Sequence, residues 1–160
     1  LNFETELQSY FLKNRFVHLG IHLKSVFSTQ PLFANYTASL LSVPYFDVLP
    51  DMNTFFLPEY RSSQFFGAGL NVVFSLKKKI DLRFDSYWYQ PILKLSKSQN
   101  GVFQTAKLFK DSNFLLSSSL IYHTIVGPIR MSLNFFPKQK DPFAFQISYG
   151  YVIFNDKAIR

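Results

Sequence analysis

The chain has 160 residues, with no cysteine and a single tryptophan. Without cysteine the protein forms no disulfide, has no thiol nucleophile and cannot build a cysteine-based zinc site. It also lacks any run of about 18 apolar residues, which excludes a transmembrane helix. The mean hydropathy is near zero, at +0.04. A membrane signal in this chain would therefore have to lie in the alternation of residues along strands.

The sequence also lacks the short motifs of common enzymes. It has no Gly-x-Ser-x-Gly nucleophile elbow, no P-loop and no dinucleotide-binding glycine pattern. Two of its three histidines, His18 and His22, would lie about 13 Å apart along a strand, too far for two ligands of one metal ion. We therefore expect no catalytic residue, no metal site and no cofactor in this chain.

Aromatic residues and positive charge are both abundant. Phe, Tyr and Trp make up 19% of the chain, and the formal net charge is +7. The aromatic excess fits either a large aromatic core or a lipid-facing wall with aromatic girdles. The basic residues are scattered or lie in turns such as 77–79, and they form no stripe with interleaved stacking aromatics. The charge therefore does not indicate nucleic-acid binding.

The clearest positive signal is an alternation of large apolar and small or polar residues. In 143–154 every odd position is large and apolar, and the even positions up to Gly150 are small or polar. Successive side chains of a strand point to opposite faces, so such a strand has one apolar and one polar face. The same pattern predicts seven strands, at 2–12, 16–27, 64–76, 80–90, 114–126, 129–136 and 143–154.

The charged residues of these strands, joined by the three histidines, all fall on the polar face. They are Glu4, Glu6, His18, His22, Lys24, Asp81, Arg83, Asp85, His123 and Arg130. A lipid-facing Arg or Lys near the bilayer midplane costs roughly 2–4 kcal/mol, so this segregation indicates a transmembrane β-barrel with a polar lumen. The polar face is then an ion-paired, hydrated interior, or alternatively a conduit or a catalytic lumen; we favour the first.

Facing also constrains register, because a slip of one residue would turn the apolar face inward. We expect three-residue turns at 13–15 and 77–79, and a type II′ turn at Gly127-Pro128. The cross-strand pairs that follow are Leu76 with Ile80, Val126 with Ile129, Glu6 with His22, and Glu4 with Lys24.

The other connections are longer, at 28–63, 91–113 and 137–142. Short turns at one end and long loops at the other are the pattern of outer-membrane barrels, and this places the carboxyl terminus on the periplasmic side. Loop 28–63 contains four prolines and many apolar residues. A loop of this length is usually functional or disordered, and its apolar content predicts that it packs against the rest of the protein.

Four segments carry a family resemblance: 56–65 with the following 67–69, then 82–85, 122–133 and 148–155. In that order they resemble the carboxy-terminal half of the bacterial surface antigen barrel superfamily. This superfamily includes the outer-membrane protein assembly factor and the two-partner secretion transporters. The greatest likeness is to the barrel that follows patatin-like phospholipase domains, and 124–133 is the most specific segment.

The resemblance implies a sixteen-stranded barrel in which the seven strands are the tenth to the sixteenth. It also implies that loop 28–63 folds into the lumen, where its Arg61 pairs with Asp85. Two features depart from the family. Arg61 is followed by Ser62-Ser63 in place of Gly-Phe, and six residues follow Phe154, where family strands usually end in an aromatic residue.

We therefore expect residues 1–160 to be the C-terminal part of one outer-membrane β-barrel domain of a Gram-negative bacterium. Its expected role is the membrane anchor, and a candidate transport module, of a patatin-like phospholipase. The alternatives are an assembly or secretion transporter without an enzyme domain, and a soluble basic β-sheet binding protein.

The expected partners are outer-membrane lipid and further barrel strands, from the parent protein or from partner chains, because seven strands cannot close a barrel. Nucleic acid is not expected. Leu1 starts within a predicted strand and no signal peptide precedes it, so we expect a longer precursor.

Overall fold

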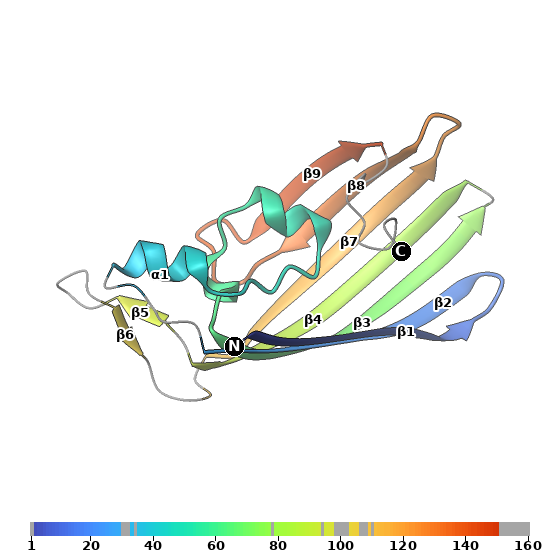
Figure 1. Ribbon diagram of the computed structural model, residues 1–160. Coiled ribbons are helices and arrows are strands. Elements are labelled where there is room, and N and C mark those ends of the chain that lie inside the picture. Colours follow the sequence, from blue (N-terminus) through green and yellow to red (C-terminus); the bar gives the residue numbers. More distant parts are fainter. Residues whose placement is uncertain are drawn as a thin grey trace.

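The computed structural model describes residues 2–29, 33, 35–77, 79–93, 95–97, 103–105, 109 and 111–150. They form an antiparallel sheet of seven strands whose order in space follows the chain (Figure 1). The strands are β1 (Asn2–Lys13), β2 (Val17–Ser28), β3 (Gln64–Lys77), β4 (Ile80–Leu93), β7 (Asn113–His123), β8 (Pro128–Phe135) and β9 (Phe143–Tyr149). The prediction of an all-β chain with seven antiparallel strands is confirmed.

The boundaries differ from the prediction mainly in the connection 91–113. β4 continues to Leu93, and part of this connection forms the two-stranded ladder of β5 (Leu95–Lys97) and β6 (Phe103–Thr105). The last predicted strand is found as β9, and its predicted residues 151–154 lie outside the described residues. No helix in the described part of the chain is long and apolar enough to cross a membrane.

The two faces of the sheet differ sharply in polarity and burial. The large apolar side chains of β9, from Phe143 to Tyr149, are 57–65% exposed, whereas Asp85 and Asn71 on the opposite face are buried. A sheet in water usually packs its apolar face on the core. Here the apolar face, called the outer face below, is open, and the polar inner face is covered over part of its area.

The cover of the inner face is loop 28–63. It contains α1 (Tyr36–Ser42) and the two 3-10 helices η1 (Pro50–Thr54) and η2 (Pro58–Tyr60). The Asn35 side chain caps α1 by accepting hydrogen bonds from the backbone of Thr37 and Ala38. Figure 1 shows the loop lying across one face of the sheet, toward the end where β5 and β6 lie. The prediction that this loop packs against the protein is confirmed.

The hydrophobic core lies between this loop and the inner face. The loop contributes Phe46, Leu49, Met52, Leu57 and Tyr60, and the rest of the chain contributes Val26, Phe65, Tyr87, Tyr89, Leu115 and Phe136. Because both sides of the core are needed to exclude water, the sheet and the loop form one packing unit.

The register of β3 and β4 agrees with the prediction except at the turn. Phe74 opposes Leu82 and Ser75 opposes Asp81, as the predicted register requires. The predicted pair of Leu76 and Ile80 is wrong, because the ladder shifts there and Lys77 opposes Ile80. An extra residue in one strand is a β-bulge, which absorbs a change of register next to a turn. Lys78, in the predicted turn, lies outside the described residues.

The predicted pair of Val126 and Ile129 is also wrong. Tyr122 opposes Ile129 and His123 opposes Pro128, so the hairpin loop is 124–127. Within it Thr124 donates hydrogen bonds from its backbone N–H and its hydroxyl to the carbonyl of Gly127, whose φ is 146°. A threonine side chain can stabilise a local turn in this way. The shift equals four residues, an even number, so both faces of the strands are kept.

The β1–β2 pairing differs by two residues. In the backbone register Glu6 opposes Lys24 and Glu4 opposes Val26, after a ladder shift between Tyr10 and Leu12. The predicted oppositions are therefore wrong, and the predicted turn 13–15 is replaced by one over 14–17, closed by a hydrogen bond from the Asn14 N–H to the Val17 carbonyl. The predicted partners still touch, because diagonal neighbours on one face are within reach of long side chains.

Candidate functional site: a loop held against the inner face

The first anchor of loop 28–63 is an aromatic ring seated on glycine. A Cβ atom on Gly67 of β3 would lie only 2.1 Å from the Phe46 ring, so only glycine leaves room for it. Around it, Phe46 contacts Phe65, Tyr87 and Tyr89, with ring centroids 5.7, 6.3 and 5.1 Å away. Tyr87 is accommodated in the same way over Gly69. The Gly-Ala-Gly segment of β3 thus forms a flat seat for an aromatic cluster.

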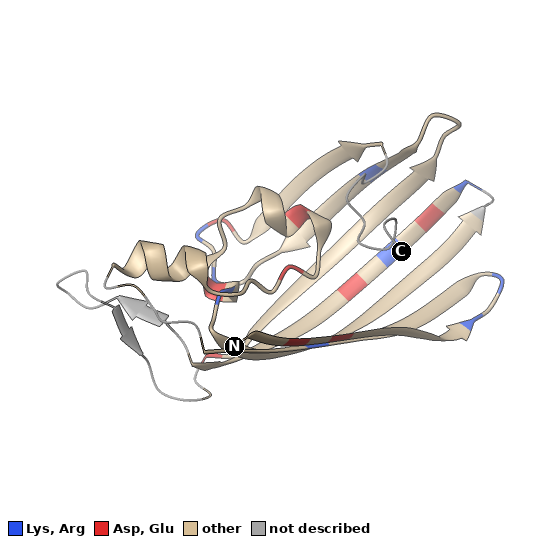
Figure 2. Ribbon diagram, in the orientation of Figure 1, with Lys and Arg blue, Asp and Glu red and all other residues tan. Residues whose placement is uncertain are grey.

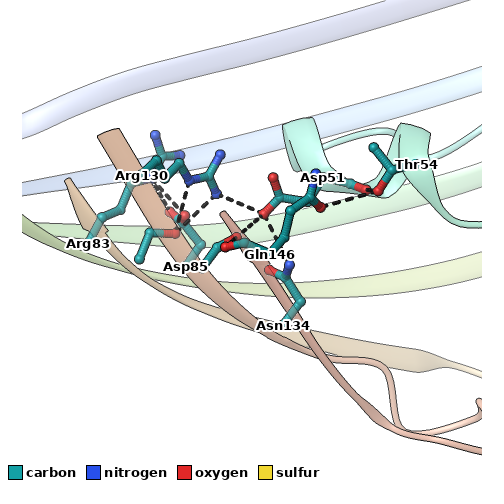
Figure 3. A network of polar contacts seen from close by, with 9 residues as sticks. Asp51, Thr54, Arg83, Asp85, Arg130, Asn134 and Gln146 are labelled. Carbon is teal, nitrogen blue, oxygen red and sulfur yellow. Dashed lines mark hydrogen bonds and ion pairs between the residues drawn. The ribbon is translucent and has the colours of Figure 1, made fainter. Parts of the chain in front are cut away.

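The second anchor is Asp51 of η1, which is only 3% exposed. One of its carboxylate oxygens accepts hydrogen bonds from Ser132 (2.6 Å) and Asn134 (3.0 Å), and Arg130 Nη2 lies 3.3 Å from it. All three partners belong to β8, and Figure 3 shows Asp51 facing Arg130 and Asn134. A carboxylate away from bulk water needs several such partners. This contact therefore fixes η1 over one strand.

The third anchor is Lys24 of β2. Its ammonium lies 2.7 Å from Asp47 of the loop and 3.0 Å from Glu4 of β1, and the lysine side chain is 8% exposed. The contact with Glu4 is one of the two predicted pairs, reached diagonally. One buried cation thus holds the loop and the edge strand β1 together.

The end of the loop is held by hydrogen bonds to β7 and to the β8–β9 connection. The Tyr60 hydroxyl donates to the backbone carbonyl of Phe114, and Gln139 donates to the Glu59 carboxylate. Burial raises the pKa of the Tyr60 phenol, so this hydroxyl remains a donor over the whole physiological range of pH.

The predicted pair of Arg61 and Asp85 is absent from the described part of the structure. The guanidinium of Arg61 stacks on the Tyr45 ring, 4.5 Å from its centroid, where Tyr45 and Arg61 form an antiparallel bridge. Asp85 is bound instead by Arg83 and Asn71, with Arg83 Nε 2.6 Å from one oxygen. Because Arg83 is two residues away on the same face of β4, it reaches Asp85 without any loop residue.

The remaining predicted residues also lie along the inner face, and four of them form two pairs. His22 Nε2 is 3.0 Å from Glu6, which is the other predicted diagonal pair, and His123 Nε2 is 2.8 Å from Asp81. His18 lies opposite Val73, half-buried. Figure 2 shows acidic and basic residues alternating along β4. Within the described ranges, no group of three or more His, Cys, Asp or Glu could hold a metal ion.

Sequence reasoning did not find the residues that hold the loop. Phe46, Asp47 and Asp51 lie in a stretch without strand periodicity, so no pattern assigned them a direction. The available signal was the pair Gly67 and Gly69, because isolated glycines within a strand often mark a close approach of another group. The predicted pair joined an arginine of the loop to an acid of the sheet. In the structure the charges are exchanged, because Asp51 of the loop meets Arg130 of the sheet.

No protein-family model, curated protein or solved structure matches the chain. The family resemblance therefore stays a prediction.

We expect Asp51 and Arg130 to be energetically coupled. A double-mutant cycle with Asp51→Ala and Arg130→Ala in the full protein should give a coupling of about 1–3 kcal/mol in the free energy of unfolding, because the two groups touch in a mostly dry site. The matched control is the cycle of Arg61→Ala and Asp85→Ala, with an expected coupling below about 0.5 kcal/mol. A larger coupling in the control would support the predicted pair of Arg61 and Asp85. Urea unfolding in detergent measures both cycles.

We expect Gly67→Leu to displace Phe46 from its seat. The new side chain would occupy the position of the ring, lower the free energy of unfolding by about 1–3 kcal/mol and expose the loop to chymotrypsin. Ala68→Leu, on the outer face of the same strand, is the control and should leave loop cleavage unchanged. Adding Phe46→Ala to Gly67→Leu should restore part of the stability. If cleavage of the loop is the same in both single variants, the ring does not hold the loop.

Proposed function

We propose that this chain is part of the wall of an outer-membrane β-barrel, which anchors its protein in lipid and carries loop 28–63 in its lumen. One observation supports this most directly. Among the described side chains of the seven strands, the outer face is exposed, mostly apolar and free of charge, while the charged side chains lie on the opposite face, which the loop partly covers. If the outer face contacts lipid, the sheet has no large apolar surface facing water.

The height of the apolar face supports the proposal. From Ile80 to Trp88 of β4 the strand advances about 26 Å, which a strand tilt of about 40° reduces to about 20 Å along a barrel axis. Apolar bands of barrels are about 25 Å tall and end in aromatic girdles. Residues that oppose one another across neighbouring strands form a row. The row of Ile80 contains Tyr122 and Tyr149, and at the other end of β4 Trp88 opposes Phe114.

The edges of the sheet indicate what completes the wall. β1 and β9 have one strand neighbour each among the described strands, and an open edge is not tolerated in hydrocarbon. In a seven-stranded antiparallel sheet the first and last strands run in the same direction. Antiparallel closure therefore needs an odd number of further strands, and the nine that the resemblance implies satisfy this. A second copy also supplies an odd number of strands, but two copies inserted in the same orientation would meet in two parallel seams.

The resemblance extends the proposal to the rest of the protein, as the anchor of a patatin-like phospholipase whose serine hydrolase domain lies outside this sequence. A loop packed over part of the inner face favours an anchor over an open conduit, so transport remains the second role. A Gly-x-Ser-x-Gly elbow elsewhere in the parent sequence, with fatty acid release from phospholipid vesicles, tests the enzyme. Repeated POTRA domains without such an elbow would assign the barrel to an assembly or secretion transporter.

We expect Trp88 to contact lipid. Its side chain is on the outer face and 38% exposed, so brominated acyl chains should quench its fluorescence strongly in vesicles containing the full protein. Any tryptophan outside this chain is replaced by phenylalanine. The matched control combines Trp88→Phe with Phe55→Trp, which moves the probe into the loop next to Phe136. Equal quenching in the two proteins would show that the outer face is not in lipid.

We expect arginine to be tolerated at 148 and not at 147. Ile147→Arg should lower the free energy of unfolding in bilayers by about 2–4 kcal/mol if Ile147 lies near the midplane, because Ile147 points outward and is exposed. Ser148→Arg, on the inner face, is the control. On the surface of a soluble protein both changes would stay within about 0.5 kcal/mol. Equal effects at the two positions would therefore favour the soluble alternative.

A further inference from the structure

The outer face contains a groove of about 420 Å³ that crosses β3, β4, β7 and β8. Its outward-facing residues come from two adjacent rows across these strands. The smallest are Ser86 and Ser118, which form the floor, and the walls include Leu70, Phe84, Leu116 and Leu133. The groove is therefore a local hollow in a mostly bulky apolar surface.

The two serines cause the hollow. Ser86 lies between Leu70 and Leu116, and Ser118 lies between Phe84 and Leu133. Each small side chain is thus flanked on both sides by large ones. Both rows lie between the row of Ile80 and the row of Trp88. If the outer face lies in lipid, the groove is in the middle of the hydrocarbon layer.

The floor of the groove is polar in an apolar surrounding. In the described structure neither Ser86 nor Ser118 makes a side-chain hydrogen bond. A hydroxyl without a partner is costly in hydrocarbon, where no water can replace it. An occupant that fits both the apolar walls and the polar floor is a chain of methylene groups carrying an oxygen.

We propose that this groove binds an acyl chain of a membrane lipid that carries a hydroxyl or ester oxygen along its length. The inference rests on the proposed function, because the membrane supplies the lipid. Four strands span about 15 Å from first to last, which gives an extended chain a continuous contact. A second copy of this sheet would present the same hollow and could not fill it, so a flexible chain fits better than another copy.

Trp88 provides the readout for a test. It follows Ser86 by two residues on the same face, about 7 Å along the strand. The full protein, with Trp88 as its only tryptophan, is titrated in detergent with lysophosphatidylcholine carrying a 12-doxylstearoyl chain, which quenches tryptophan. We expect saturable quenching. Lysophosphatidylcholine with a 12-hydroxystearoyl chain should compete about two- to tenfold better than the stearoyl form, as one neutral hydrogen bond predicts.

Two variants separate the hollow from its hydroxyls. Ser118→Leu fills the hollow and should weaken the saturable quenching about tenfold or more. Ser25→Leu makes the same change on the outer face of β2, outside the groove, and should leave quenching unchanged. The double variant Ser86→Ala and Ser118→Ala keeps the space, so it should bind both lipids while losing the preference for the hydroxyl.

The proposal is overturned if quenching does not saturate, or if Ser118→Leu and Ser25→Leu behave alike. Free 12-hydroxystearic acid competing better than its lysolipid would assign the groove to fatty acids and overturn the membrane-lipid source. These outcomes are separate from the proposed function. Quenching of Trp88 by brominated bilayers would persist in Ser118→Leu if the outer face lies in lipid, even where the groove binds nothing.

Discussion

The packing of loop 28–63 against the inner face is the interaction on which the rest of this structure depends. A single sheet has no core of its own, and the main hydrophobic core on this one pairs loop residues with residues of the sheet. Phe46 supplies the shape that fits the glycine seat, while Asp51 and Asp47 bind the two cations of the sheet that lie under the loop. Because these contacts are geometrically distinct, the loop is fixed in position and in orientation.

The covering of one face explains why the other can remain apolar. Charges of the strands are collected on the inner face, where they bind one another or the loop, so no strand needs a polar residue pointing outward for charge compensation. Arg83, Asp85 and Asn71 bind one another within two neighbouring strands. The outer face then has to match only the surrounding solvent, and three serines in its middle rows, Ser9, Ser86 and Ser118, depart from that match.

Sequence alternation was sufficient to predict the strands and the direction of their side chains, but not the register. The errors at β1–β2 and β7–β8 equal two and four residues, and only even shifts preserve facing. The choice among even shifts depends on turn chemistry, such as the hydrogen bonds of Thr124, and on bulges that have no sequence signature here. The predicted partner of Asp85 was wrong for a related reason. A loop without periodicity gives no direction to Arg61, whereas Arg83 reaches the carboxylate from its own strand.

The sequence distances of the loop contacts have a consequence for the order of folding. The contact between Lys24 and Asp47 spans 23 residues, whereas Asp51 reaches Ser132 and Asn134 across 81 and 83 residues. Contacts with short spans close early because less chain entropy is lost in forming them. The first half of the loop can therefore settle on β2 and β3 while β8 is still unpaired, and Asp51 acquires its partners only when β8 joins the sheet. The Asp51 carboxylate therefore becomes buried only when the last strands of the sheet have been added.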